Sequence, residues 1–143
     1  MSLLFSETEQ KRVVEAIRTA EMATSGEVRV HIEKLCAEND VLERAKQVFA
    51  QLGMHRTELK NGVLFYLAVE NRKFAVLGDQ GINERVPDNF WNDVRDIMRA
   101  HFVKNEFSEG LSKGIEQAGQ QLKTYFPRQD NDINELSDDI SFG

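Results

Sequence analysis

The chain has 143 residues and a mass of 16.4 kDa, the common size of one folded domain, which leaves no room for two catalytic domains. Hydrophobic residues make up 41% of it, with nine Phe and only two Pro, so a packed core is expected and disorder throughout is excluded. The formal net charge of −6 gives no general attraction to phosphate backbones, which argues against nucleic acid as a partner.

The cysteine content and the N-terminus both bear on cellular location. The single cysteine, Cys36, cannot form an internal disulfide, which fits a reducing compartment. The apolar run at residues 3–5 is too short for a signal-peptide core, and no stretch approaches the roughly 20 apolar residues of a membrane helix. We therefore expect a soluble, cytoplasmic protein without membrane insertion.

The N-terminal region predicts a helix followed by a strand. Ser6 and Glu9 have the spacing of a capping box, and apolar residues then recur at helical spacing, which predicts a helix over residues 7–22. Strict alternation of apolar and polar residues over 27–33 predicts a strand with one thinly covered face.

The middle of the chain predicts a crossover helix and a hairpin. An apolar stripe indicates a helix from about residue 40 to 52, with Gly53 suited to its left-handed cap. The uninterrupted apolar run at 63–69 is typical of a central strand covered on both faces. Residues 74–77 predict a third strand, antiparallel to the second across the connection 70–73. A crossover helix joins parallel strands, so the first two strands should be parallel.

Two amphipathic helices are expected after a glycine-rich loop at residues 78–88. Asp88, which follows a proline, is predicted to start the first of them, whose apolar face runs to Phe102. The second carries an apolar stripe from Phe107 to Leu122. Glycines inside this helix cost about 1 kcal/mol each relative to alanine, which suggests close backbone packing at Gly110, Gly114 and Gly119.

The C-terminal segment differs from the rest in composition. Residues 128–143 hold five acidic side chains against one arginine, so we expect an acidic, disordered tail after a folded domain at 1–127. Ile140 and Phe142 leave a second interpretation open, in which the tail adds to a sheet edge or meets a partner.

Strand directions gather polar side chains at one end of the predicted sheet. The end of the third strand should lie beside the starts of the other two, which brings together oxygen-bearing side chains of the kind that bind Ca²⁺ or Mg²⁺. The candidate metal ligands are Asp79, Glu84, Asp88, Glu27 and Asn61. The surrounding binding-loop positions are Ser25, Gly26, Gly62, Gly78, Gln80, Gly81 and Asn83.

The same residues also fit an ordinary structural interpretation. Asp79 can end a strand, Asn61 can sit in a turn and Asp88 can cap a helix. Spacing alone favours this interpretation, because the loop lacks the D-x-D-x-D-G pattern of an EF-hand and the glycine fingerprints of phosphate loops. The three histidines show no zinc-site spacing.

The order of three segments resembles the TPM domain family, named after a plant thylakoid-lumen protein and its relatives. The segments are SGEVRVHI at 25–32, NGVLFYLAVENRKFAVLGDQGINERVPD at 61–88 and HFVKNEFSEGLSKGIEQAG at 101–119. The resemblance spans about residues 6–125 and implies an α/β fold, a three-layer α/β/α sandwich with a small mixed sheet flanked by helices. It also implies a divalent-cation site in acidic loops at one sheet edge.

The resemblance implies several possible functions rather than a single one. Members of the family have been described as acid phosphatases, photosystem II repair factors and receptor-associated modulators. The family's strand-end and loop positions correspond here to Asn61, Gly62, residues 78–81 and Glu84. Many relatives are exported and anchored, whereas this chain resembles the short, soluble, stand-alone bacterial type.

Two classes of function follow from these observations. The first is a divalent-cation-binding module with a protein-interaction or accessory role toward an unidentified protein partner. The alternative is a metal-dependent, acid phosphatase-like phosphomonoester hydrolase, in which Arg85 would hold the phosphate. A structural subunit without an ion is the third interpretation. The sequence shows no base or nucleophile for the hydrolase.

Overall fold

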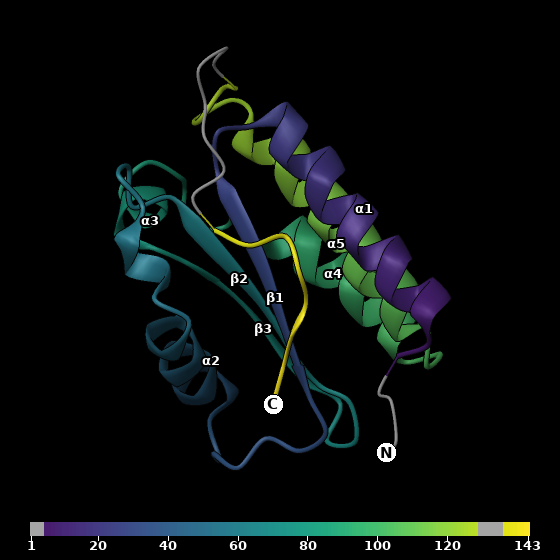
Figure 1. The fold of residues 1–143 in the computed structure, drawn as a ribbon. Coiled ribbons are helices and arrows are strands. Elements are labelled where there is room, and N and C mark those ends of the chain that lie inside the picture. The colour runs from purple at the N-terminus through teal and green to yellow at the C-terminus, as the bar shows by residue number, and fades with distance from the viewer. Residues whose placement is uncertain (1–4, 129–135) are drawn as a thin grey trace.

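The computed structural model describes residues 5–128 and 136–143 and confirms the α/β/α sandwich (Figure 1). A mixed sheet with strand order β3-β2-β1-β4 lies between two layers of helices. The strands are β1 (Glu27–Glu33), β2 (Gly62–Ala68), β3 (Lys73–Gly78) and β4 (Ser141–Phe142). The helices are α1 (Glu7–Ala23), α2 (Val41–Gln51), η1 (Met54–Arg56), α3 (Gln80–Asn83), α4 (Asn92–Phe102) and α5 (Phe107–Leu122). None of the helices in the described ranges is both long and apolar enough to cross a membrane.

The helices begin and end where local chemistry favours it. The capping box at α1 is present, because the Ser6 side chain accepts from the Glu9 amide and the Glu9 side chain accepts from the Ser6 amide. The Asp40 side chain caps α2, and Gly53 follows that helix in the left-handed region with φ of 67°. These caps confirm the predicted ends of both helices to within two residues.

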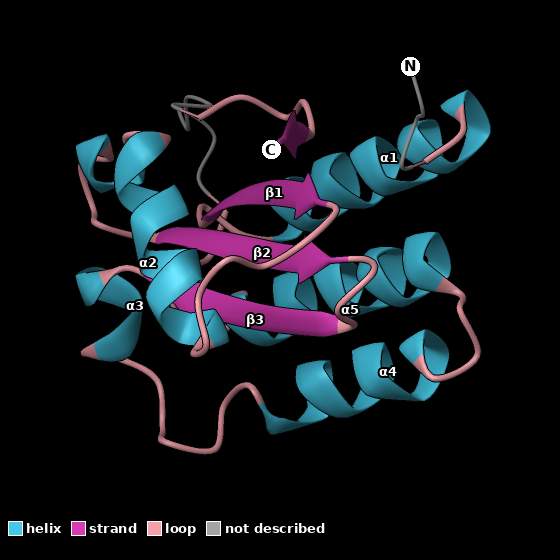
Figure 2. Cartoon of the chain, turned by 90° about the horizontal axis from the view of Figure 1, so that it is seen from below, coloured by secondary structure: helices cyan, strands magenta, loops and turns pink. Residues whose placement is uncertain are grey.

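The sheet has the predicted topology in its three main strands. β1 and β2 are parallel, with Glu27 opposite Gly62, and β2 and β3 are antiparallel, with Val63 opposite Gly78. β2 is buried along its whole length because helices cover both faces of the sheet (Figure 2). One core lies between the sheet and α1, α4 and α5, and a smaller one lies between the sheet and α2.

Close approach of α5 to its neighbours explains the glycines within it. A Cβ added at Gly114 would lie 2.6 Å from Met98 on α4, and one at Gly119 would lie 2.7 Å from the Cα of Ala20 on α1. The backbone of α5 therefore packs directly on both helices, as the sequence predicts.

The connection from β3 to α4 differs from the expected loop. The short helix α3 interrupts it, with Asp79 as its N-cap. Asp88 does not cap α4, which begins at Asn92 after Trp91. The prediction of a cap at Asp88 is therefore wrong. Asp88 lies instead within a turn in which the Phe90 amide donates to the Pro87 carbonyl at 3.0 Å. The side chains of Phe90 and Trp91, which come next, are buried before the helix starts.

The C-terminal segment also corrects an expectation. The predicted disorder does not hold for residues 136–143, since β4 pairs in parallel with β1 and Ile140 packs on the main core. The edge of β1 supplies backbone hydrogen bonds that composition does not report, which offsets the acidic character of the segment. The sheet-edge interpretation of this segment is thus the one that the structure shows. Residues 129–135 of the predicted tail lie outside the described residues.

Candidate functional site

The starts of β1 and β2 and the end of β3 meet at one end of the sheet, as the strand directions predict. The Asp79 amide donates to the Gly62 carbonyl at 2.9 Å, and the Glu27 amide donates to the Asn61 carbonyl at 3.1 Å. The Asn61 side-chain amide donates to the Ser25 carbonyl at 3.0 Å. Backbone pairing therefore fixes these segments against one another before any ligand is considered.

Asp79 lies at the centre of this arrangement and is only 5% exposed. Its Oδ1 accepts from the Gln80 amide at 2.8 Å and is 3.0 Å from His55 Nδ1. Its Oδ2 is buried and has no hydrogen-bond donor among the described residues, and the same holds for Asn61 Oδ1. A buried oxygen without a donor is costly by about 1 to 3 kcal/mol, and more when it is charged. Such oxygens are therefore uncommon in folded proteins unless a water or an ion meets them.

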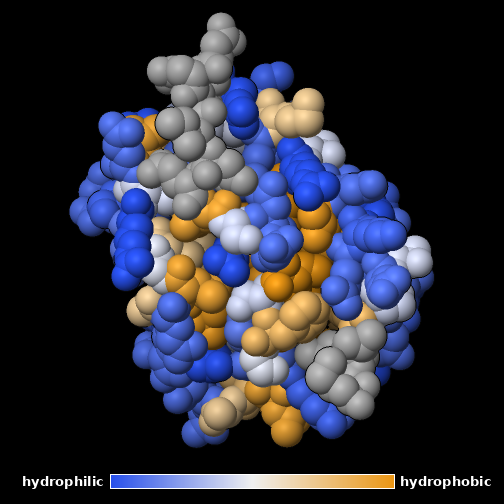
Figure 3. All heavy atoms as spheres, in the orientation of Figure 1, coloured by the Kyte–Doolittle hydropathy of each residue, from blue (hydrophilic) through white to orange (hydrophobic). Residues whose placement is uncertain are grey.

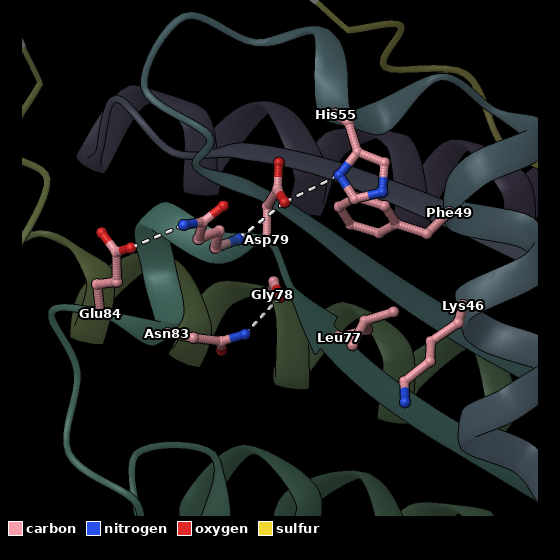
Figure 4. Close-up of a pocket in the computed structure, with 9 residues that line it drawn as sticks. Lys46, Phe49, His55, Leu77, Gly78, Asp79, Asn83 and Glu84 are labelled. Atoms are coloured by element: carbon pink, nitrogen blue, oxygen red, sulfur yellow. Dashed lines mark hydrogen bonds and ion pairs between the residues drawn. The ribbon is translucent and has the colours of Figure 1, made fainter.

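A cavity of about 460 Å³ opens beside Asp79 (Figure 4). Helix α2 and η1 form one wall, and the end of β3 with α3 forms the other. The imidazole of His55 is 63% exposed and lies against the ring of Phe49 with centroids 4.6 Å apart. The lining residues are Lys46, Phe49, His55, Leu77, Gly78, Asp79, Gln80, Asn83 and Glu84.

Three of the predicted metal ligands, Glu84, Glu27 and Asp88, have other partners or face solvent. Glu84 lines the same cavity, but its carboxylate accepts from Gln80 Nε2 at 3.0 Å on the outer side of α3. Glu27 Oε1 accepts from the Leu136 amide at 3.2 Å. Asp88 is exposed beyond α3. Over residues 5–128 and 136–143, no three side chains of His, Cys, Asp or Glu form a group that could hold a metal.

The predicted loop positions have mostly structural roles. Asn83 Nδ2 donates to the Gly78 carbonyl at 3.1 Å and so holds α3 onto the end of β3. The Gly81 amide donates to the Lys60 carbonyl at 2.8 Å. Gly62 lies between Glu27 and Asp79 and is covered, because a Cβ there would lie 3.3 Å from the Met54 carbonyl.

Arg85 lies away from the cavity. Its guanidinium lies over the ring of Phe126, which follows α5, 4.7 Å from the ring centroid. The lysine side chain that lines the cavity is Lys46 on α2. Lys46, Phe49 and His55 were not among the residues that the sequence predicts for the site. Only the packing of α2 and η1 on β3 brings them there, and their spacing in the chain carries no motif that would reveal it.

A second polar cluster lies at the other end of β1, beneath β4. Glu33 is 5% exposed and accepts from both Arg44 Nε and Nη2 at 2.8 Å, and also from the Tyr66 hydroxyl. His31 lies between Glu33, at 3.3 Å, and Ser141 Oγ, at 2.9 Å. Burial opposes the charged form of Glu33, but these donors outweigh it and lower its pKa to about 2. The carboxylate is fully partnered, which gives it a structural role.

Fold and sheet-end geometry together define a small α/β/α domain whose polar loops gather at one edge of the sheet. The family model of the TPM domain matches residues 2–121, and the chain therefore belongs to the TPM domain family. A comparison with curated proteins found no match.

Solved structures show the same fold. The chain is 47% identical to the BA42 protein of the psychrophilic bacterium Bizionia argentinensis, solved by NMR, with a TM-score of 0.93 over 100% of this chain and 98% of that one. An N-terminal domain from P. gingivalis is 22% identical, with a TM-score of 0.70 over 86% and 79% of the two chains. The N-terminal domain of cg2496 from Corynebacterium glutamicum is 14% identical, with a TM-score of 0.66 over 81% and 72%. The last two share the fold.

Proposed function

We propose that this TPM domain binds a divalent cation at the sheet end, with Asp79 and Asn61 as its side-chain ligands. The observation that carries the proposal is the pair of buried oxygens, Asp79 Oδ2 and Asn61 Oδ1, that lack a donor in the described part of the chain. A cation would satisfy both oxygens and neutralise the buried carboxylate. Both ligands are oxygens, which favours Ca²⁺ or Mg²⁺ over zinc.

The cation would have few protein ligands. One carboxylate and one amide oxygen leave most coordination positions to backbone carbonyls and water, the pattern that Mg²⁺ in particular accepts. Glu27 is left out of this set because its carboxylate accepts from the Leu136 amide. A site of this kind orders the loops around it and needs no nucleophile, which suits an accessory module. We further propose that the domain acts in the cytoplasm and binds a protein partner that is still unidentified.

Thermal unfolding with and without cation tests the site. Mg²⁺ or Ca²⁺ should raise the melting temperature of the wild type, because a ligand at 100 times its Kd stabilises the native state by about 2.7 kcal/mol. Asp79→Asn keeps the shape of the side chain but removes its charge, and should abolish the rise. Asp88→Asn is the matched control and should respond like the wild type, since Asp88 is exposed and away from the cavity. Equal rises in wild type and Asp79→Asn would refute the proposal.

The second candidate function, hydrolysis of a phosphomonoester, has one observation in its favour. Asp79 accepts from His55 Nδ1 at 3.0 Å, an arrangement that orients the imidazole and leaves Nε2 as a general base toward water. Lys46 lines the same cavity and could bind a phosphate oxygen. His55 would thus be the base that the sequence analysis did not identify for the hydrolase.

Hydrolysis of p-nitrophenyl phosphate tests this alternative. His55→Ala should lower the rate by about 100-fold or more, the usual contribution of a general base. Arg85→Ala should leave it unchanged, because Arg85 lies over Phe126 rather than in the cavity. If His55→Ala and the wild type hydrolyse the ester equally fast, the activity comes from a contaminating enzyme and this function is excluded.

A further inference from the structure

The imidazole of His55, which lines the cavity, contacts the buried carboxylate of Asp79. Its Nδ1 is 3.0 Å from Asp79 Oδ1, and the same oxygen accepts from the Gln80 amide at 2.8 Å (Figure 4). An ionised carboxylate only accepts hydrogen bonds, so Nδ1 carries the proton in this contact. Oδ1 therefore has two donors, while the second oxygen, Oδ2, is buried and has none among the described residues.

Two donors on one oxygen restrict how the carboxylate can turn. The terminal torsion of an aspartate is broad, so a carboxylate with a single donor still rotates about its last bond. Here the donors come from different segments, the Gln80 amide from α3 and the imidazole of His55 from η1. The plane of the Asp79 carboxylate is thereby fixed, and Oδ2 is presented in one orientation before a cation arrives.

His55 is itself held in place, although its ring is mostly exposed. The ring lies against that of Phe49, which is buried, with the two planes at 59°. The side chain of Lys60 donates to the backbone carbonyl of His55. Because an exposed ring adds little to the core, stability alone does not explain why the imidazole is held against Asp79.

A second contact between a histidine and a carboxylate shows what distinguishes this one. His101 Nδ1 is 2.8 Å from Glu106 Oε1, but the Glu106 side chain is 49% exposed, whereas that of Asp79 is 4% exposed. An exposed carboxylate can exchange its partner for water at little cost, and a buried one cannot. Only the contact at Asp79 therefore fixes the orientation of a buried carboxylate.

The walls of the cavity belong to a mostly hydrophilic side of the molecule. In Figure 3, which has the orientation of Figure 1, the surface over α2 and α3 is mostly hydrophilic, whereas hydrophobic surface gathers in the middle of the face. A hydrated cation can therefore approach these helices across polar surface.

We propose that His55 is a positioning residue for the cation: through Nδ1 it holds the Asp79 carboxylate so that Oδ2 stays free to bind the ion. This inference rests on the proposed cation site. A donor behind a metal-ligating carboxylate fixes the ligand, and its loss costs about 10- to 100-fold in metal affinity. The role needs a donor at the position of Nδ1 and nothing from Nε2.

Calorimetric titration of the full chain with Mg²⁺ and with Ca²⁺ tests this role through three variants. His55→Ala should raise the Kd of the more tightly bound ion by about 10- to 100-fold. The side-chain nitrogen of asparagine is as many bonds from Cβ as Nδ1 of histidine, whereas that of glutamine is as many as Nε2. His55→Asn should therefore restore most of the affinity, and His55→Gln should not.

Melting temperatures without cation separate positioning from a general loss of stability. All three variants should melt within about 2 °C of the wild type, because the His55 side chain is mostly exposed. His101→Ala is the matched control, since it removes the other histidine–carboxylate contact, away from the cavity. This variant should bind the cation like the wild type.

The outcomes distinguish a failure of this inference from a failure of the proposed function. If the wild type binds neither ion, or if Asp79→Asn binds as tightly as the wild type, the cation site is absent and the role of His55 falls with it. If the wild type binds and Asp79→Asn does not, but His55→Ala keeps the wild-type Kd, only the role of His55 is overturned.

Two further results would overturn the role of His55 alone. Equal affinities in His55→Asn and His55→Gln would show that a donor at the position of Nδ1 is not what the site requires. A loss of affinity in His55→Ala that comes with a large drop in the cation-free melting temperature would assign His55 a structural role instead.

Discussion

Arg44→Met should destabilise the fold by about 3 kcal/mol or more, because it leaves a buried carboxylate without its main partner. Glu33 and Arg44 are joined by two hydrogen bonds of 2.8 Å, and their side chains are 6% and 18% exposed. Methionine fills much of the space of the arginine stem but cannot donate to Glu33. Urea unfolding at pH 7 measures the loss.

The pH profile separates this effect from a simple loss of packing. In the wild type, the lowered pKa of Glu33 stabilises the fold above the ordinary value of 4.5, and this contribution is lost as pH falls toward about 2. Without Arg44, burial dominates and raises that pKa, so acidification below neutral pH should stabilise Arg44→Met relative to the wild type. Parallel profiles for the two proteins would contradict the assignment.

Arg12→Met is the control for this prediction. Arg12 binds Glu109 and Glu116 at about the same distances, 3.0 and 3.1 Å, but on a surface where the partners are 42% and 37% exposed. Exposed ion pairs contribute about 0 to 1 kcal/mol, so this variant should lose less than about 1 kcal/mol.

Gly81→Ala should destabilise the protein by about 1 to 3 kcal/mol and distort the sheet-end site. A Cβ at Gly81 would collide with the carbonyl oxygen of Leu59 and lie 2.6 Å from that of Lys60. Both obstacles are backbone atoms, so either α3 or the preceding loop must shift. Because Asp79 caps α3, the shift should also weaken the response to cations.

Gly26→Ala is the matched control for this glycine. It lies at the same end of the sheet, but its nearest neighbours to an added Cβ are at 3.5 Å, an ordinary contact. Chemical denaturation should therefore find Gly26→Ala close to the wild type in stability. If Gly81→Ala were equally stable and bound cations normally, the close packing of α3 on the 59–60 loop would have no role in the site.

Much of the fold follows from local sequence signals. The capping box at Ser6 and Glu9, the cap at Gly53 and the apolar run of β2 each act through neighbouring residues, so they are visible without the structure. The strand directions then bring Asp79, Asn61 and Glu27 to one end of the sheet, because the pairing of the strands fixes which strand ends meet.

The rest of the site depends on contacts between distant segments. His55 reaches Asp79 only because η1 packs over the end of β3, and Glu27 turns to Leu136 only because the C-terminal segment docks on β1. Arg85 lies over the ring of Phe126, which comes from a distant part of the chain after α5. The acidic composition of residues 136–143 predicts a disordered tail, because composition contains no information about the unpaired backbone groups at the edge of β1.

Titration of the isotope-labelled protein with Mg²⁺ and then Ca²⁺, followed by NMR at every amide, tests the cation site most directly. We expect the largest shifts at Asp79, Gln80 and the side-chain amide of Asn61, the groups beside the two buried oxygens without donors in the described chain. Asp88 should not respond, and Asp79→Asn should remove the shifts. Unchanged spectra, or shifts that persist in Asp79→Asn, would show that no cation binds at this end of the sheet.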